Sequence, residues 1–272
     1  DVSLTFKPAK EDTGYVFSRV DLPGKPLIRA LSDYVCETKR GTTLEKDGIK
    51  LKTTEHVLAA LVGLEIDNVI IEIDAEEPPI MDGSSKYFVK ALEKVGILKQ
   101  SKLRNEFVIK DIIHYSDEES GSEITLIPSD SYQVITMVDY ETKVLGTQNA
   151  TLNDLKDFKT DFANARTFSF LHEIEMLLEN NLIKGGDLNN AIVYVDKKIS
   201  DETMDKLKKA FNRKSVSVKP NGILDNLNLH YQNEAARHKL LDVLGDLALI
   251  GKRIRGKAVS YTHLTLPTSF LV

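Results

Sequence analysis

The stretch NEAARHKLLDVLGDLALIGK, residues 233–252, predicts a long helix that is buried on most of its sides. At about 100° per residue, His238, Asp242 and Asp246 step only about 40° from one to the next, and Lys239 falls beside Asp246, so these residues form one polar stripe. Leu, Val and Ala fill most of the remaining circumference, which is the reverse of an ordinary surface helix. Such a helix fits between packed layers, and its polar stripe is expected to face something specific.

The composition indicates an ordinary globular protein with room for one large or two modest domains. The chain has 272 residues, is 42% hydrophobic and carries a net charge of -5 at pH 7. Its mild acidity argues against a nucleic-acid surface, and no apolar run approaches the roughly 20 residues that span a bilayer. A single cysteine, Cys36, excludes an internal disulfide and fits a reducing compartment. We therefore expect a cytoplasmic enzyme or binding protein.

The order of the expected elements indicates an α+β fold built from two halves. Short strands dominate residues 1–50, a helix follows at about 54–61, a strand comes next, and a second helix is expected at about 85–95. The charged stretch 99–105 is the candidate linker. Strands then resume, residues 143–157 read as a loop running into a helix, and a strand–helix–strand series precedes the long helix. Each half thus combines a sheet with two main helices.

The polar stripe of the long helix has two interpretations. In the first, His238 and Asp242 form a structural hydrogen bond one helical turn apart. In the second, both hold a metal ion, because imidazole and carboxylate are ordinary zinc ligands and the i, i+4 spacing lets both point at one ion. The second interpretation requires a third ligand from elsewhere in the chain.

The segment KTTEHVLAALVGLEIDN, residues 52–68, supplies a candidate for that ligand. A threonine can cap its helix, which places Glu55 and His56 in the first turn. His56 shares its helix face with two alanines and a glycine, which leaves room for a close approach. The alternative is a surface glutamate and a histidine of the capping region. The Glu-His order is not the H-E-x-x-H zinc motif, so His56 needs distant partners to hold a metal.

Three segments together resemble one enzyme family. TTEHVLAALVGLEIDNVIIEIDAEEPPIMDGSS (53–85), ARTFSFLHEIEMLLENNLIKGGDLNNAIV (165–193) and EAARHKLLDVLGDLALIG (234–251) look like the signatures of the UDP-3-O-acyl-N-acetylglucosamine deacetylases. These are zinc enzymes of lipid A biosynthesis, and the segments follow the family's order over most of residues 50–258.

The resemblance implies a fold, a cofactor and a reaction. The fold is two α+β domains, residues 1–103 and 104–272, whose helices are sandwiched between two sheets with the active site between them. His56, His238 and Asp242 would be the ligands of a catalytic Zn2+, with water in the remaining position. The implied reaction removes the N-acetyl group from an acylated UDP-amino sugar. No nucleic acid and no obligate protein partner are expected.

The resemblance also implies roles for residues around the metal. Glu55 would act as general base on the water, and Thr167 would donate to the oxyanion that develops at the amide. Lys239 would add positive charge near the metal, and Asp246 would orient a catalytic histidine. From the residues alone, Thr167 reads equally as a β-branched strand residue, Lys239 as a surface partner of Asp242, and Asp246 as an exposed carboxylate.

A segment around residues 168–195 matches the family's insert, which forms a passage for the acyl chain. By spacing alone its apolar residues are equally ordinary core. The predicted lining residues are Phe168, Phe170, Ile174, Leu177 and Ala191.

The two ends of the chain depart from the family pattern. The family's opening strand and Gly-rich turn precede the position of Asp1. The family's general acid is a histidine in a Gly-His pair followed by Asn, whereas this chain reads GKAVSYTHLTLPTSFLV from Gly256, which leaves His263 as the candidate. The resemblance ends at Ser260, and we hypothesise that the tail beyond it is foreign. A catalytically impaired or non-catalytic remnant, or a zinc amidohydrolase for another acylated amine, are therefore the alternatives to an active deacetylase.

Overall fold

A computed structural model describes most of the chain and confirms the α+β class. The described residues are 1–38, 41–118, 120–179, 190–197, 199–210 and 214–263. Helices and strands are mixed in both halves of this part of the chain. None of its helices has the length and apolar character required to cross a membrane.

The first half of the chain forms two small sheets and two helices. Its strands are β1 (Leu4–Pro8), β2 (Tyr15–Arg19), β3 (Leu27–Arg29), β4 (Val35–Glu37), β5 (Thr43–Lys46), β6 (Ile49–Leu51) and β7 (Val69–Ile73), and its helices are α1 (Glu55–Gly63) and α2 (Lys86–Val95). One sheet has the order β1-β7-β2-β3, in which β7 pairs antiparallel with β1 and parallel with β2. The other sheet, β4-β5-β6, is antiparallel.

Local sequence explains how these elements face one another. In β7 the residues Val69, Ile71 and Ile73 are buried and alternate with half-buried neighbours, so the sheet has one apolar face. All nine residues of α1 are buried, as expected of a helix that is apolar around its circumference. α2 buries only Phe88, Val89 and Leu92 and exposes Lys90 and Lys94. α1 is therefore the inner helix and α2 the outer one.

The second half adds a five-stranded sheet, a long central helix and an insert. Its strands are β8 (Glu106–Val108), β9 (Ile113–Asp117), β10 (Ser122–Ile127), β11 (Gln133–Asp139), β12 (Thr147–Leu152), β13 (Phe168–Phe170), β14 (Ile192–Tyr194), β15 (Arg253–Arg255) and β16 (Lys257–His263), and its helices are α3 (Phe158–Asp161), α4 (Leu171–Glu179), α5 (Asp201–Ala210) and α6 (Glu234–Leu247). The large sheet has the order β12-β11-β16-β10-β9 and is antiparallel except where β11 meets β16. α6 packs on this sheet, where the Thr136 hydroxyl donates to the Ala236 carbonyl at 3.0 Å.

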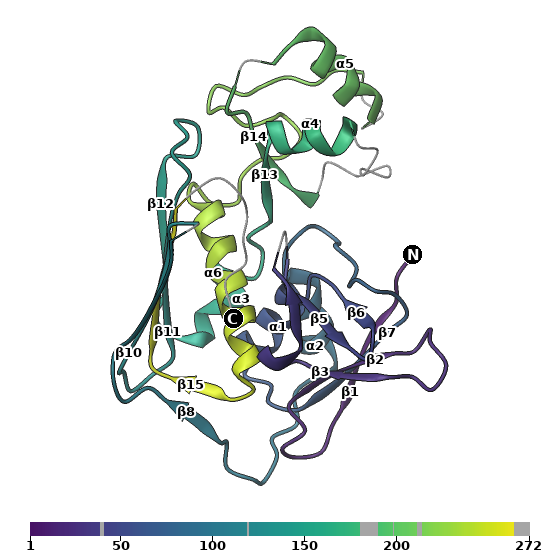
Figure 1. Ribbon diagram of the computed structural model, residues 1–272, viewed down its shortest axis with the longest axis vertical. Coiled ribbons are helices and arrows are strands. Elements are labelled where there is room, and N and C mark those ends of the chain that lie inside the picture. Colours follow the sequence, from purple (N-terminus) through teal and green to yellow (C-terminus); the bar gives the residue numbers. More distant parts are fainter. Residues whose placement is uncertain (39–40, 119, 180–189, 198, 211–213, 264–272) are drawn as a thin grey trace.

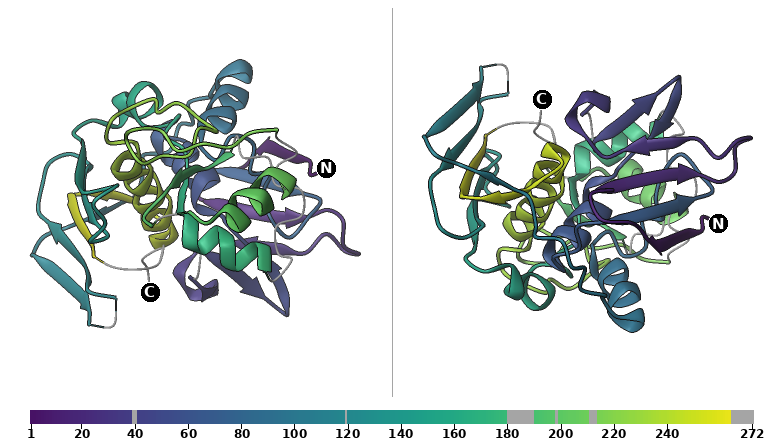
Figure 2. Two further views of the ribbon diagram at one scale, coloured as in Figure 1. Left: turned by 90° about the horizontal axis from the view of Figure 1, so that it is seen from above. Right: turned by 90° about the horizontal axis from the view of Figure 1, so that it is seen from below.

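α1 and α6 lie side by side at the centre of the molecule (Figure 1). The five-stranded sheet is on the far side of α6 and the strands of the first half are on the far side of α1, and the views of Figure 2 keep this order. A Cβ atom at Gly245 would lie 2.1 Å from the Glu55 carbonyl oxygen, so α6 approaches the start of α1 more closely than any larger residue allows. The helices are thus sandwiched between sheets, as the resemblance implied.

The insert between α3 and α6 projects from this body, at the top of Figure 1. It contains the parallel pair β13-β14 with α4 and α5. It buries a small apolar cluster of its own, made of Leu171, Ile174, Val193, Val195, Leu207, Val216 and Leu224. The main core is separate and runs continuously from the first half into the second.

Two stretches differ from the sequence-based prediction. Residues 147–152 form β12, whereas a loop was expected; TQNATL is polar because β12 is the edge strand and buries only Ala150 and Leu152. The α5 helix was not anticipated, since DETMDKLKKA carries few apolar residues and buries Leu207 alone completely. The other expected helices lie within two or three residues of their predicted positions, except that α6 ends at Leu247 and continues as a 3-10 turn.

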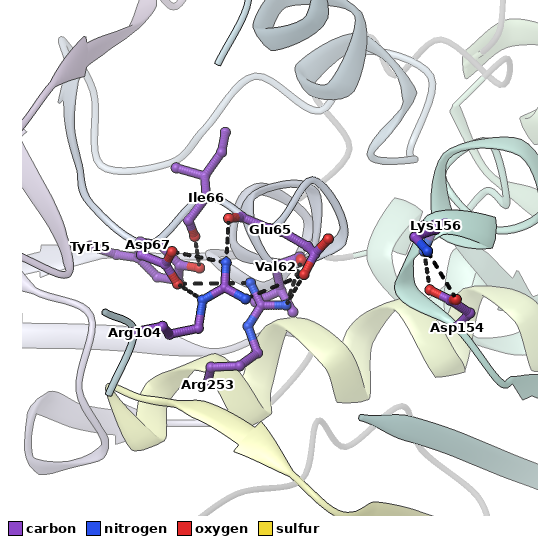
Figure 3. Close-up of polar contacts among 9 residues, drawn as sticks. All are labelled: Tyr15, Val62, Glu65, Ile66, Asp67, Arg104, Asp154, Lys156 and Arg253. Carbon is purple, nitrogen blue, oxygen red and sulfur yellow. Dashed lines mark hydrogen bonds and ion pairs between the residues drawn. The ribbon is translucent and has the colours of Figure 1, made fainter. Parts of the chain in front are cut away.

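Two arginines of the second half hold the C-terminal end of α1 (Figure 3). Arg104, in the candidate linker, donates to both carboxylate oxygens of Asp67 at 2.8 and 3.0 Å and to the Glu65 carbonyl at 3.0 Å. Arg253 donates to the Val62 carbonyl at 3.3 Å. Positive charge at a helix C-terminus is favourable because the last carbonyls lack helical partners. These contacts fix α1 against the second half at the end opposite Glu55.

Candidate metal centre

The structure brings His56, His238 and Asp242 together at the crossing of α1 and α6. Their ligand atoms all lie within 4.8 Å of one another. The Asp242 Oδ1 atom is 3.6 Å from His56 Nε2 and 3.4 Å from His238 Nε2. The two imidazole rings are nearly perpendicular, with centroids 4.9 Å apart. All three side chains are buried, so the convergence is a feature of the core.

This donor set fits a divalent metal ion. Asp242 Oδ1 is buried and has no hydrogen-bond partner within the described part of the chain, although two imidazole nitrogens face it. A buried oxygen left without a partner costs free energy, and a cation held by the same three ligands would satisfy it. Two imidazoles and one carboxylate also match a catalytic site, in which three protein ligands leave a position open.

Neighbouring contacts prepare the ligands for that role. The Ala165 carbonyl accepts a hydrogen bond from His238 Nδ1 at 3.0 Å. Because a carbonyl can only accept, Nδ1 carries a proton, and Nε2 is the nitrogen that faces Asp242. Burial, and then the nearby His238, lower the pKa of His56 to about 4. His56 is therefore neutral at pH 7, which is the form that binds metals.

The Asp242 carboxylate is shared between the ligand cluster and Lys239. Its Oδ2 atom accepts from Lys239 Nζ at 2.9 Å, and both residues are buried. Burial alone would raise the pKa of Asp242, but His238, Lys239 and His56 together lower it. For Lys239, burial favours the neutral amine, yet Asp242 outweighs it and raises the pKa. Asp242 is thus an anion and Lys239 a cation inside the site, and the interpretation of Lys239 as a surface residue is wrong.

Glu55 and Asp246 are two further buried carboxyl groups beside the cluster. Glu55 Oε2 accepts from the Thr42 backbone N–H at 3.0 Å, and Asp246 Oδ1 accepts from the Thr42 hydroxyl at 2.6 Å. Burial, and then the charge of Asp242, raise the pKa of Glu55 to about 8. Burial, and then Glu55, raise the pKa of Asp246 well above its usual range. The alternatives of a surface Glu55 and an exposed Asp246 are both wrong.

Thr42 is a site residue that sequence reasoning missed. It binds both carboxylates at once, and its carbonyl accepts from the Thr54 hydroxyl at 3.3 Å. Thr54 therefore ties α1 to the residue that precedes β5 and does not cap the helix with its side chain. Thr42 and Asp246 are 204 positions apart, so the local sequence GTTL, residues 41–44, could not predict their contact.

The ligand cluster opens into a cavity. Thr167 and Phe168 line it, as the resemblance implied, and several unforeseen residues line it too. Glu173 is one of these; its Oε2 atom accepts from the Phe170 N–H and from the Ser169 hydroxyl, both at 2.8 Å. The complete lining is Gly41, Thr53, Glu55, His56, Glu77, Ile80, Thr167, Phe168, Ser169, Glu173, His238, Lys239 and Asp242.

The other residues predicted for the acyl passage do not line this cavity. Phe170 is buried in an aromatic group with Tyr140, Phe168 and Tyr194. Ile174 belongs to the insert's own core. Ala191 is half-buried, and its carbonyl accepts from Asn226. The Leu177 side chain lies outside the described part of the structure, so the passage stays a prediction.

His263 is the last residue of β16, and its backbone pairs with Asp139 of β11. Its side chain and residues 264–272 lie outside the described part of the structure. The assignment of His263 as general acid therefore also stays a prediction.

Comparison with known proteins gives a consistent family match. A sequence model described as UDP-3-O-acyl N-acetylglycosamine deacetylase matches residues 1–213 and 202–263. The match passes Ser260, where the resemblance was expected to end, by three residues. It covers all the residues of the candidate metal centre.

Curated relatives carry the same description alone or in combination. The chain is 46% identical over 260 residues to a protein of Porphyromonas gingivalis named bifunctional enzyme LpxC/FabZ; the match covers 96% of this chain and 56% of that protein. It is 39% identical over 256 residues to a UDP-3-O-acyl-N-acetylglucosamine deacetylase of Thermodesulfovibrio yellowstonii, covering 94% and 78% of the two chains. The chain thus spans little more than half the length of some relatives and most of the length of others.

Proposed function

Because the chain belongs to the UDP-3-O-acyl N-acetylglycosamine deacetylase family, we propose that it is a zinc-dependent hydrolase acting on UDP-3-O-acyl-N-acetylglucosamine. The reaction cleaves the amide bond with water and gives acetate and the free amine. The observation that carries this proposal is the convergence of two histidines and an unpaired carboxylate oxygen from helices far apart in the sequence.

We assign His56, His238 and Asp242 to hold the zinc ion. When bound there, zinc would supply a Lewis acid that polarises the amide carbonyl and makes water more acidic. The choice of zinc over other divalent metals rests on the family and on the mixed nitrogen and oxygen ligands.

The protein's own groups divide the remaining work. Glu55 directly precedes ligand His56, and its carboxyl group is held by the Thr42 N–H, so we assign it to take a proton from the attacking water. The positive charge of a bound zinc ion would favour the ionised form of Glu55 and so lower its pKa from the value of about 8 that burial and Asp242 produce. The Thr167 hydroxyl lines the same cavity and donates to the amide oxygen as negative charge develops on it. The buried ammonium of Lys239 adds positive charge beside that oxygen. A general acid must protonate the leaving nitrogen. His263 is our candidate for this acid, and we assign Asp246 to orient the imidazole of the acid.

The proposal extends to the organisation and setting of the protein. We place the domain boundary between residues 103 and 104, so that Arg104, which binds the segment after α1, is the first residue of the second domain. We propose a cytoplasmic location and a step of lipid A biosynthesis, with the acylated UDP-amino sugar as the partner. The insert, including Phe168 at the cavity, receives the acyl chain.

The test combines metal analysis with a product assay. The purified chain should contain about one zinc ion and release acetate from the acylated UDP-sugar. Glu55→Gln, which keeps the size of the side chain but cannot take the proton, should retain the metal and lose about 10²- to 10⁴-fold in turnover. Glu93→Gln on the exposed face of α2 is the matched control and should leave turnover unchanged.

Each departure from this result has a distinct meaning. Unchanged turnover in Glu55→Gln refutes the assignment of the base. Bound zinc without acetate release points to another acylated amine as substrate or to a chain impaired in its general acid. A chain that binds no divalent metal is a non-catalytic remnant of the fold, and the proposal fails.

A further inference from the structure

A second buried charge pair lies one helical turn from the metal ligands, and the chemistry proposed above does not use it. Arg166 and Glu234 are almost completely enclosed, with 6% and 0% of their side chains exposed. Arg166 Nε donates to Glu234 Oε1 at 2.8 Å and Arg166 Nη2 donates to Oε2 at 3.2 Å, a two-pronged geometry. The same Nη2 also donates to the Asn228 carbonyl at 2.6 Å.

The carboxylate of Glu234 binds backbone as well as side chain. Its Oε1 atom accepts from the Arg166 backbone N–H at 3.1 Å, and its Oε2 atom accepts from the His230 N–H at 2.6 Å. Removing Glu234 would therefore free the main chain at residue 166, besides leaving a guanidinium unpaired in the core. A contact that fixes main chain sets the position of the residues on either side.

Those neighbours are Ala165 and Thr167, and both face the metal centre. The Ala165 carbonyl orients the imidazole of His238, and Thr167 lines the cavity. The backbone N–H groups of Ala165 and Thr167 bind the carbonyls of Phe162 and Gly83 at 2.9 and 2.8 Å. In this three-residue segment, only the central N–H depends on a side chain, and that side chain is Glu234.

Helix α6 carries both Glu234 and His238, and so it connects the ion pair to the candidate metal ligand. Glu234 is the first residue of α6, and His238 follows four positions later, so the two side chains share one face of the helix. The ion pair ties the segment to this face at Glu234, and the Ala165–His238 hydrogen bond ties it again one turn further on. A change in the Arg166–Glu234 pair would therefore shift the Ala165 carbonyl relative to the His238 imidazole.

We propose that Arg166 and Glu234 are positioning residues for the metal centre: they set the Ala165 carbonyl against His238 and the Thr167 hydroxyl against the cavity. This inference rests on the proposed function, because it assumes that the three ligands hold a metal. It predicts that disturbing the pair weakens metal binding and lowers kcat, with little change in KM. Partners that orient a ligand typically contribute about 10- to 100-fold in metal affinity or activity.

The first test is Arg166→Lys, measured as the zinc dissociation constant by chelator competition and as the visible spectrum of the cobalt-substituted protein. Lysine keeps the charge but cannot bond to both carboxylate oxygens and the Asn228 carbonyl together. We expect about 10-fold weaker metal binding or more, and an altered cobalt spectrum. Arg19→Lys is the matched control, since Arg19 binds both oxygens of Asp21 and the Lys50 carbonyl in the same way, away from the metal.

The second test separates positioning from stability. The double variant Arg166→Met with Glu234→Met removes both charges while roughly keeping volume, and such replacements are often neutral for stability. Because the Arg166 and His230 N–H groups also lose their acceptor, we expect a folded chain with a lowered thermal transition, together with weakened metal binding and an altered cobalt spectrum.

The outcomes exclude one another. If the unaltered chain binds no metal, the proposed function fails. If it binds metal and a folded variant binds it equally well with the same cobalt spectrum, the positioning role is refuted. If neither variant folds, the pair serves folding itself and the inference is likewise overturned.

Discussion

The helix pair α1/α6 and the insert of β13, α4, β14 and α5 differ in how their side chains are buried. The helix pair lies inside the main core and encloses a polar stripe. The insert has a small core of its own, while Phe168, Phe170, Ile192 and Tyr194 of its strands belong to the main core. All three ligand candidates come from the helix pair, and the insert contributes Phe168, Ser169 and Glu173 to the lining of the cavity. In the proposed function the chemistry thus belongs to the helix pair in the main core, and selection of the acyl chain belongs to the insert.

This contrast predicts that changes in turnover diminish from the helix pair toward the insert. Asp242→Ala should have the largest effect, because it removes a ligand and leaves Lys239 buried without its partner. Metal analysis should find no zinc, and acetate release should fall to background. Asp205→Ala on the exposed face of α5 is the control and should keep both. Retained stoichiometric zinc in Asp242→Ala would place the metal elsewhere.

Thr167→Val should have the next largest effect, since it keeps the shape of the side chain and deletes the hydroxyl. Loss of one oxyanion donor typically lowers kcat about 10²- to 10³-fold. Zinc content should be unchanged, which separates this variant from Asp242→Ala. Thr151→Val, at an exposed position of β12, should behave as the unaltered chain does. If Thr167→Val and Thr151→Val lowered kcat by the same factor, the hydroxyl of Thr167 would have no specific role in catalysis.

The sequence predicted the parts of this site that follow a helical period. His238, Asp242 and Asp246 share one stripe, and a wide apolar remainder correctly indicated a buried helix. The contacts that complete the site have no such period: Thr42 reaches Asp246 across 204 positions, and Glu234 reaches Arg166 across 68. The polar edge strand β12 was missed because its residues satisfy the sheet's hydrogen bonds without an alternating apolar pattern. Local pattern therefore identifies the candidate ligands, and tertiary contacts identify the residues that support them.

Gly245→Ala tests whether the close approach of the two helices is required. Helix propensity alone would make this substitution stabilising by about 0.5–1 kcal/mol. The new Cβ atom, however, would lie 2.1 Å from the Glu55 carbonyl, which is backbone and cannot rotate away. We expect a net loss of about 1–3 kcal/mol in the free energy of unfolding and a partial loss of turnover. Chemical denaturation of the metal-free chain measures this, and a gain in stability would contradict the tight crossing.

Leu207→Ala should have the smallest effect on turnover, although its side chain is fully buried. Leu207 belongs to the insert's core, so the cavity left behind should destabilise that unit by about 2–5 kcal/mol. Faster amide exchange confined to the insert would report this, while the zinc affinity set by α1 and α6 should be unchanged. Because the insert is proposed to receive the acyl chain, KM should rise for a long-chain substrate and stay constant for a short-chain one. Weakened zinc binding in Leu207→Ala would show that the insert and the helix pair are one cooperative unit, and the division between chemistry and substrate selection would have to be abandoned.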